Sequence, residues 1–412
     1  MGIMVFNKLP PIRYNFLIAF ILILLVNFGV SDVSGSEIKL TPKISIQETY
    51  NDNIDFTSKN EIDDFITVFT PSLNFVRDTE KSHIKFNASA GIEDYQDENN
   101  LDDVIHYYDL TSGYNLSSLI MIDFFSSFRR DTTLDEELET TGLILERSDR
   151  ESYRIQPGIT WNITEVDSLG FNFNFTKTRY DRESYTDYDN YDGTISWNHL
   201  ISPTGTTYFI SAGYNLTDYN DADVETYSLY SGFNLPLDPE WELNCWGGIR
   251  RTINKYDTYL LMPYPEPPFF YFARDDKTRR DWGGIGLFLI KRSFEKGSLL
   301  AEISRNIIPS GSGGTLERDR ARLNISYRIT DILTARLGGS WTDSQSESSN
   351  WNSDEEYYSF NSSLTYRLGE KITATLSYTR SEKDYKNRSS DTKADRNVVF
   401  IKITSYWEKL LK

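Results

Sequence analysis

The sequence has one cysteine, three histidines and, beyond its first 30 residues, no long hydrophobic run. The single cysteine, Cys245, excludes an intrachain disulfide, and its neighbours predict that it is a small apolar residue on the outer face of a strand. His83, His106 and His199 are far apart in the sequence and lack the i, i+4 spacing of a helical zinc site. We therefore expect no metal site and no cofactor.

Basic residues are also in deficit. The chain has 61 acidic and 43 basic residues, for a formal net charge of −18. Nucleic-acid binding depends on a surplus of lysine and arginine that neutralises phosphates, so we expect no nucleic-acid partner. Acidic clusters at 97–103, 135–139 and 187–192 predict solvated loops. Calcium, or a bridge to lipid phosphates through divalent ions, is the alternative for these clusters.

The first 36 residues have the layout of a secretory signal peptide. Lys8 and Arg13 precede an apolar run at 16–30, and small residues follow at 34–36. The apolar run is shorter than the roughly 20 residues that a membrane-spanning helix needs. We expect cleavage near Glu37 and export of the chain, with a retained membrane anchor as the alternative.

From residue 37 onward, apolar and polar side chains alternate with a period of two. Near the C-terminus Ile372, Ala374 and Leu376 alternate with Thr373 and Thr375. Successive side chains of a strand point to opposite faces, so one face of this sheet is apolar and the other polar. The mean hydropathy of −0.49 is low because polar lumen residues dilute apolar ones. The pattern predicts an all-β fold, a transmembrane antiparallel up-and-down β-barrel.

The alternation divides residues 39–407 into about eighteen strands, an even number as in single-chain bacterial barrels. The connections alternate between short and long. Membrane barrels have short periplasmic turns and long outer loops, which predicts that both termini are periplasmic. We expect one barrel domain at 37–407 and a short tail at 408–412. The short connections are 115–118, 162–167, 200–204, 236–240, 328–332 and 367–370, and the long ones are 51–63, 133–150, 257–278, 344–354 and 384–394.

Arginines are expected on the lumen side of the wall. Arg318, Arg320 and Arg322 share the polar parity of one strand, and Arg336 has this parity on the next strand. If the preceding hairpin is symmetric, Glu302 faces Arg322 across the strands. Water-filled pores use such a charged wall to select solutes. Structural ion pairing inside the lumen is the alternative.

The connection at 257–278 is the longest and has an unusual composition, with four prolines followed by four consecutive aromatic residues. Prolines stiffen a loop, and clustered aromatics are unlikely to be left in water on a mobile tip. We expect this loop to bend into the barrel mouth as a constriction whose aromatics stack on sugar rings. A cap on the outer rim or on a neighbouring protomer is the alternative. The candidate ligand-binding residues are Tyr264, Phe269, Phe270, Tyr271 and Phe272, and the glycines expected to make room for the loop are Gly247, Gly248, Gly283, Gly284 and Gly286.

Enzyme signatures are sparse, and we expect no catalytic activity. His199 and Ser202 are close in sequence but fall at a predicted periplasmic turn, which favours polar rim residues over a hydrolase site. A nucleotide-binding loop needs a strand before it and a helix after it, and no helix is predicted after the glycine-rich pieces at 283–286 and 311–314. A flexible outer loop explains the second piece, and relief of crowding in the wall explains the first.

The segment 41–54, which ends in the pattern Tyr-Asn-Asp-Asn-Ile, and the segments 64–67 and 70–73 resemble bacterial outer-membrane proteins of the β-barrel porin 2 type. Several members of this poorly characterised group accompany exopolysaccharide and extracellular-sorting systems. The resemblance implies an outer-membrane barrel and a link to polysaccharide export. It supplies no catalytic or ligand residues.

Three functions follow as hypotheses. The first is a pore for diffusion or export of a polar solute, with polysaccharide suggested by the resemblance, because barrels of about 16 to 18 strands leave an aqueous lumen. The second is a structural or adhesion barrel that displays acidic loops without an open pore. The third is a hydrolase in the barrel wall. The expected partners are outer-membrane lipid and lipopolysaccharide, the barrel-assembly machinery, and polysaccharide or its export proteins.

Overall fold

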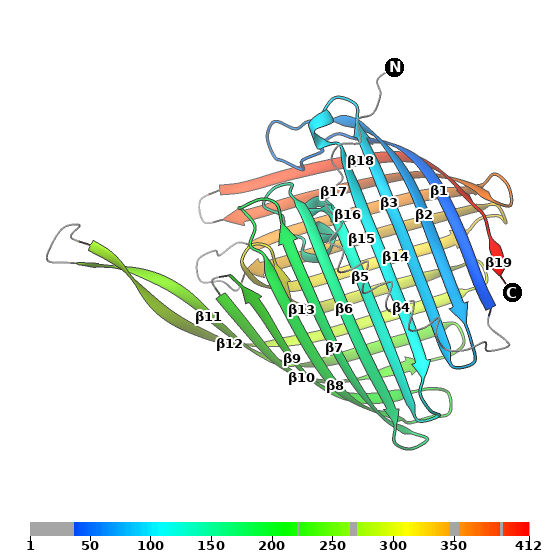
Figure 1. Cartoon of the computed structure of the whole chain (residues 1–412), viewed down its shortest axis with the longest axis horizontal. Coiled ribbons are helices and arrows are strands. Elements are labelled where there is room, and N and C mark those ends of the chain that lie inside the picture. Colours follow the sequence, from blue (N-terminus) through cyan, green and yellow to red (C-terminus); the bar gives the residue numbers. More distant parts are fainter. Residues whose placement is uncertain (1–36, 221, 264–269, 347–353, 388–389, 412) are drawn as a thin grey trace.

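The chain forms a closed antiparallel β-barrel (Figure 1). The computed structural model describes residues 37–220, 222–263, 270–346, 354–387 and 390–411, with the backbone alone at 257–276, 386–391 and 409–411. Each strand pairs with its neighbours in the sequence, and β1 (Glu37–Asn51) pairs with β18 (Ser390–Tyr406) to close the wall. The prediction of an up-and-down barrel of eighteen strands is confirmed.

The other wall strands follow in chain order, and every adjacent pair is antiparallel. They are β2 (Asp64–Asp78), β3 (Ser82–Tyr95), β4 (Asp103–Asn115), β5 (Ile120–Thr132), β6 (Asp149–Asn162), β7 (Asp167–Tyr180), β8 (Tyr188–Leu200), β9 (Thr207–Tyr219), β10 (Ala222–Pro236), β11 (Trp241–Pro263), β12 (Phe270–Phe294), β13 (Gly297–Ser310), β14 (Gly314–Arg328), β15 (Leu333–Ser346), β16 (Asp354–Arg367) and β17 (Ile372–Asn387).

The end of the chain differs from the expected tail. A short strand, β19 (Lys409–Leu411), pairs with residues 38–40 of β1 after a break that follows Tyr406. The last residues therefore prolong β18 along the closing edge of the barrel. This extra pairing gives backbone groups at the start of β1 partners that they would otherwise lack.

The outer face of the wall is apolar. Ile46, Ile249 and Ile303 are 56–64% exposed, and the residues beside them in the strands point into the barrel. Such exposure of large aliphatic side chains on many neighbouring strands fits lipid rather than water. No helix among the described residues is long and apolar enough to cross a bilayer. The closed barrel and its apolar outer band support an outer-membrane location.

The short connections lie where the sequence predicted them, but several long ones are shorter than expected. The strands flanking 384–394 continue to Asn387 and resume at Ser390, and those flanking 257–278 continue to Pro263 and resume at Phe270. Alternating polar and apolar residues were assigned to loops because charges and prolines interrupt the pattern there. The first and last described residues of the chain, Glu37 and Leu411, both lie at the end of the barrel that has the short turns.

The expected constriction at 257–278 was wrong in its placement. Most of these residues are paired strand, and the β11–β12 hairpin projects away from the barrel (Figure 1). Tyr264 and Phe269 lie outside the described residues, and only the backbone is described at Phe270, Tyr271 and Phe272. The paired strands at 257–263 and 270–276 continue away from the barrel and do not enter its mouth (Figure 1).

The glycines expected to accommodate that loop have other roles. A Cβ at Gly248 would overlap Tyr230, and a Cβ at Gly283 would overlap the guanidinium of Arg250. The main chain of β10 therefore fills the space at Gly248, and the Arg250 side chain fills the space at Gly283. Gly247, Gly284 and Gly286 lie on the other face of these strands, which points outward like Ile249.

The upper part of the β11–β12 hairpin leaves the wall. β12 pairs with β13 only from Gly286 onward. Above this point Tyr219 of β9 donates a hydrogen bond to the Gly314 carbonyl (2.6 Å) and accepts one from the Ser310 amide (3.2 Å). β9 therefore contacts the β13–β14 turn directly, and the barrel is narrowed at the end opposite the short turns. Buried Arg250 pairs with Glu317 and joins the departing hairpin to β14.

We expect the β1–β18 closure to be detectable by cross-linking. Ser45 and Thr404 are direct partners in the register. In a Cys245→Ser background, Ser45→Cys with Thr404→Cys should form a disulfide that changes the mobility of the denatured chain on non-reducing gels. The control pair, Ser45→Cys with Ile403→Cys, places the second thiol on the opposite face. Equal cross-linking of both pairs would contradict the register.

Candidate functional site

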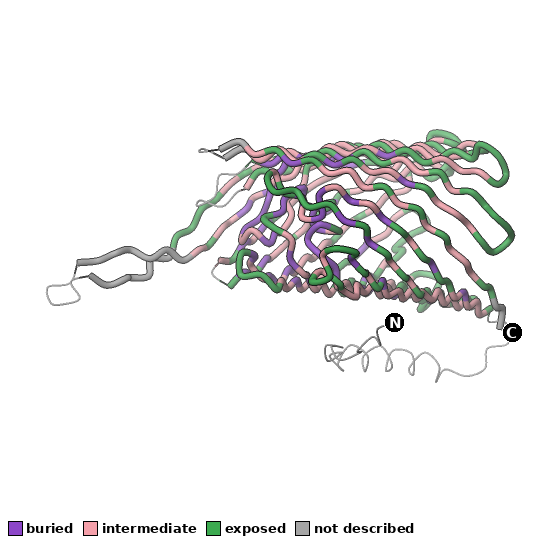
Figure 2. Tube along the Cα trace, turned by 90° about the horizontal axis from the view of Figure 1, so that it is seen from above, coloured by how far each residue is buried: buried purple, intermediate pink, exposed green. Residues whose placement is uncertain are grey.

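The connection between β5 and β6 folds into the barrel and forms the centre of the candidate site. It contains η2 (Thr133–Glu137), one π-helical turn, and α2 (Leu138–Thr141). Figure 2 shows buried residues gathered inside one end of the barrel. The sequence analysis placed 133–150 outside as an exposed acidic loop, and that prediction was wrong. We call residues 133–148 the inward segment.

Local sequence explains why the inward segment is helical. At its start, Asp135 accepts hydrogen bonds from the amide (2.9 Å) and hydroxyl (2.8 Å) of Thr132, which caps the first turn. At its end, Gly142 has φ +71° and donates to the Leu138 carbonyl. A Cβ at Gly142 would also lie 2.9 Å from the Thr342 side chain. Glycine therefore both ends α2 and allows its close approach to β15.

Apolar burial holds the inward segment against the wall. Leu138 is fully buried, and Leu134 and Ile144 pack in the same cluster with Tyr357 of β16 and Phe56. Burying a large apolar side chain contributes about 2 kcal/mol, so these contacts are a substantial driving force for docking. The short run Leu143-Ile144-Leu145 was the signal in the sequence that this connection is not a solvated loop.

Polar side chains of the wall complete the docking. Arg318 of β14 donates to the Thr140 carbonyl, and Ser344 of β15 donates to the Thr141 carbonyl. Both bonds satisfy carbonyls at the C-terminal end of α2, where helix carbonyls otherwise lack partners and a cation is favourable. Sequence analysis placed Arg318 on the lumen wall, and the structure assigns it to holding the inward segment.

The inward segment crosses the lumen. It leaves the wall at β5 and docks on β14, β15 and β16. In a closed barrel of eighteen strands, β5 and β14 are nine strands apart and thus lie on opposite sides. The segment therefore divides the end of the barrel that is opposite the short turns into two parts. On one side Tyr180, Tyr188 and Tyr219 pack together, and on the other side a cavity is present.

A buried ion pair anchors the root of the segment. Arg150 of β6 makes two hydrogen bonds to Asp131 of β5, at 3.0 and 2.9 Å, and both side chains are almost completely buried. Glu137 lies 3.9 Å from Arg150 and accepts a hydrogen bond from the Gly311 amide at 3.3 Å. Burial raises the pKa of the Glu137 carboxyl, and the nearby Arg150 guanidinium opposes this shift.

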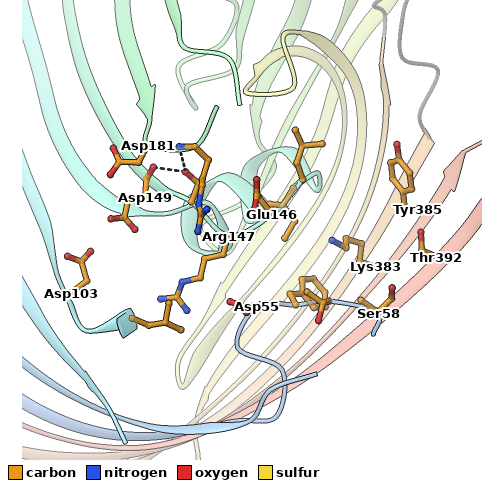
Figure 3. Close-up of a pocket in the computed structure, with 18 of the residues that line it drawn as sticks. Asp55, Ser58, Asp103, Glu146, Arg147, Asp149, Asp181, Lys383, Tyr385 and Thr392 are labelled. Atoms are coloured by element: carbon orange, nitrogen blue, oxygen red, sulfur yellow. Dashed lines mark hydrogen bonds between the residues drawn. The ribbon is translucent and has the colours of Figure 1, made fainter. Parts of the chain in front are cut away.

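The cavity beside the inward segment has a volume of about 880 Å³ and is lined by the segment, the β1–β2 and β3–β4 connections, and β17 and β18. We call it the vestibule. Asp103, Asp149 and Asp181 lie on one side, with Arg147 near them, and Lys383 lies on the other side, beside Tyr385 (Figure 3). A solute that enters here meets a lining of carboxylates, cations and hydroxyls, which suits polar molecules.

Arg147 gives the vestibule a fixed cation. Its Nη2 donates to the Tyr95 hydroxyl at 2.7 Å, and its guanidinium carbon lies 5.2 Å from the centre of that ring. Lys383 is held similarly, 5.2 Å from the centre of the Phe56 ring. These cation–π contacts fix the direction of both charges. Sequence analysis missed all four residues, because nothing local indicates which loops meet across the barrel mouth.

Below the inward segment, toward the short turns, Arg320, Arg322 and Arg336 line the lumen as predicted. We call these residues the arginine wall. Glu302 and Arg322 are direct partners in the register and form a hydrogen-bonded ion pair of 2.6 Å, as the symmetric hairpin predicted. Arg336 donates to Thr365 at 3.3 Å. Arg320 forms no hydrogen bond or ion pair with any residue that the structure describes. The wall therefore combines a neutralised pair with one arginine that is open to solutes.

Enzymatic groupings are not brought together by the described part of the chain. His199 pairs with Asp167 at 2.9 Å on the rim of the short turns. Among the described residues, no three histidine, cysteine, aspartate or glutamate side chains are placed to hold a metal ion. The absence of catalytic activity stays an expectation.

Comparison with known sequences identifies no relative. No family model matches the chain. No curated protein sequence matches it. The resemblance to the β-barrel porin 2 type therefore stays a prediction.

Solved structures share the barrel fold. The ferric citrate transporter FecA in its unliganded form has 7% identity and a TM-score of 0.48, over 92% of this chain and 80% of FecA. OccK2 (OpdF) of Pseudomonas aeruginosa, in complex with glucuronate, has 9% identity and a TM-score of 0.45, over 92% and 98%. The outer membrane protein OpdK of Pseudomonas aeruginosa has 7% and 0.42, over 90% and 99%. With TM-scores below 0.5, these similarities carry no argument about this chain, whose barrel is established by its own strand pairing.

The raised pKa of Glu137 predicts that the inward segment docks more tightly in acid. The docked state holds its proton above the ordinary carboxyl pKa of 4.5, so docking loses stability as the pH rises from 4.5 through the raised value. If docking narrows the lumen, single-channel conductance should increase with pH over this window. Glu137→Gln should flatten the profile. Glu139→Gln should retain it, and a retained slope in Glu137→Gln would contradict the assignment.

Proposed function

We propose that the chain is an outer-membrane diffusion pore for small polar solutes, with a lumen narrowed by the inward segment. The observation that supports this proposal best is the vestibule, a polar cavity at the barrel mouth that lies beside the inward segment. Barrels of this size have room for water inside, whereas the smallest barrels are filled by side chains. The proposed path runs through the vestibule and past the arginine wall.

Charge on the lumen walls supports selection among these solutes. Arg320 on β14 lies across the barrel from β5, which carries Asp123 at a lumen-facing position. Asp109 of β4 also faces the lumen but is paired with Arg129. The opposed charges of Arg320 and Asp123 set up a field across the lumen that orients dipolar and charged solutes. Arg320 is the residue that we expect to influence permeating ions most, because Arg322 is already paired with Glu302.

Polysaccharide is a finer proposal for the solute. It derives from the family resemblance, and the low-identity structural neighbours do not bear on it. The surrounding lipid and lipopolysaccharide, the barrel-assembly machinery and export proteins remain proposed partners. We also propose that the side with the short turns, with both termini, faces the periplasm.

A second candidate is a structural barrel without an open pore. It is favoured by the tight docking of the inward segment, whose side chains Leu138, Thr133 and Glu137 are almost completely buried. In this case the vestibule would be a closed surface pocket. Electrical measurements on the purified barrel separate the two functions.

Replacing residues 134–147 with a short Gly-Ser linker should raise single-channel conductance several-fold, because the segment crosses the lumen. Conductance in both proteins, higher in the variant, supports a constricted pore. Conductance in the variant alone supports the structural barrel. Equal conductance would show that the segment does not narrow the path. Heat-modifiable migration on gels should confirm that both barrels are folded.

Arg320→Glu should shift the pore toward cations, because it reverses a lumen charge that no described residue neutralises. The reversal potential in a salt gradient measures this shift. Arg292→Glu is the matched control, since Arg292 is on the outer parity of β12 and stacks on Trp241. An equal shift in both variants would assign the effect to overall charge rather than to the lumen.

A further inference from the structure

Aromatic side chains line the lumen on the part of the wall formed by β9, β10 and β11. Phe209, Tyr230 and Trp246 occupy the lumen parity of these strands, next to outward-facing residues such as Leu229. Ring centres are 6.4 Å apart for Phe209 and Tyr230, and 4.8 Å apart for Tyr230 and Trp246. All three side chains are partly exposed.

Leu287 of β12 lies opposite Trp246 and extends this row. We call Phe209, Tyr230, Trp246 and Leu287 the lumen stripe. Its positions run across strands from β9 to β12, which corresponds to about 14 Å at the usual strand spacing. A row of this length is long enough for a short oligosaccharide rather than for a single small molecule.

Two glycines let the strands that carry the rings approach closely. Gly232 is opposite both Phe209 and Trp246, and a Cβ there would overlap the main chain and Cβ of Trp246. Gly248 is opposite Tyr230, and a Cβ there would overlap the main chain and Cβ of Tyr230. Glycine is therefore required for the close contact between neighbouring strands at the stripe. The pairing of a glycine with an aromatic residue on two adjacent strand pairs is a repeated feature of this wall.

The polar groups beside the lumen stripe are amides and hydroxyls, together with the Asp192 carboxylate of β8 near Tyr230. Asn244 donates to Asn234 at 2.6 Å on the next inward positions toward the short turns, and Ser211 is directly opposite Tyr230. The charges of the neighbouring strand β13 are neutralised, because Glu302 is paired with Arg322. Amides and hydroxyls beside aromatic rings suit a neutral ligand that has an apolar face and many hydroxyl groups.

We propose that the lumen stripe binds pyranose rings of a neutral oligosaccharide during passage through the barrel. This inference rests on the proposed pore and specifies a class of solute for it. The rings supply stacking surfaces for the C–H faces of sugars, and the adjacent amides and hydroxyls exchange hydrogen bonds with sugar hydroxyls. An aromatic carboxylate is disfavoured as the ligand, because its charge would require a free cation beside the rings.

The test is block of single-channel current by neutral oligosaccharides in planar bilayers. The probes are three series of two to six units: α-1,4-linked glucose, β-1,4-linked glucose and β-1,4-linked N-acetylglucosamine. Stacking on C–H faces is common to all three, so at least one series should interrupt the current, more strongly as the chain lengthens. Trp246→Ala should weaken the block about tenfold, and Trp246→Phe should restore most of it.

Trp282→Ala is the matched control, because Trp282 is 65% exposed on the outer face of the same hairpin, and it should leave the block unchanged. A conducting barrel that none of the series blocks, or a block equally strong in Trp246→Ala, overturns the inference and leaves the pore intact. Block by an aromatic carboxylate that depends on Arg320 instead of Trp246 also overturns it.

A barrel that does not conduct overturns the pore itself. Oligosaccharide binding is then measured by quenching of tryptophan fluorescence in detergent, with Trp246→Phe as the comparison. Quenching lost in Trp246→Phe keeps the lumen stripe as a binding site, and no quenching by any series removes it.

Discussion

The structure depends on one constraint: every backbone amide and carbonyl of the wall must find a partner within the sheet. In lipid an unpaired peptide group costs several kcal/mol, so the sheet must close, and it does so where β1 meets β18. The tail strand β19 extends this closure. Where the pairing is given up, between the upper parts of β12 and β13, the hairpin has already left the wall and charged residues hold it. Closure also fixes which side chains point inward, and therefore what a solute meets.

Closure gives the chain an interior, and the inward segment determines how that interior is used. Its docking combines buried leucines, a capped helical turn and hydrogen bonds from Arg318 and Ser344 to exposed helix carbonyls. Apart from the cap, each contact joins residues that are distant in the sequence. The same segment forms one wall of the vestibule and leaves the lumen stripe and the free Arg320 below it. In the proposed pore, the inward segment, Arg320 and the lumen stripe lie along one path.

The candidate site was only partly accessible to sequence reasoning. The parity of Arg318, Arg320 and Arg322 and the contact between Glu302 and Arg322 could be predicted, because hairpin symmetry and a period of two determine both. The constriction was assigned to the wrong connection. Prolines and aromatics at 257–278 attracted attention, whereas the apolar run at 143–145 was masked by surrounding acids. Composition indicates that a loop must pack somewhere, but it does not indicate against what.

The sequence alone determined the properties that repeat at short range. These are the barrel class, the number of strands, the face on which each side chain lies, and which connections are short. These depend on alternation and on turn residues, which act between neighbours. Only the tertiary structure decided which connection enters the lumen, that Arg147 and Lys383 meet in one vestibule, and that glycines of one strand allow the close approach of the next. These features depend on residues that closure brings together across the barrel, and no local pattern encodes that distance.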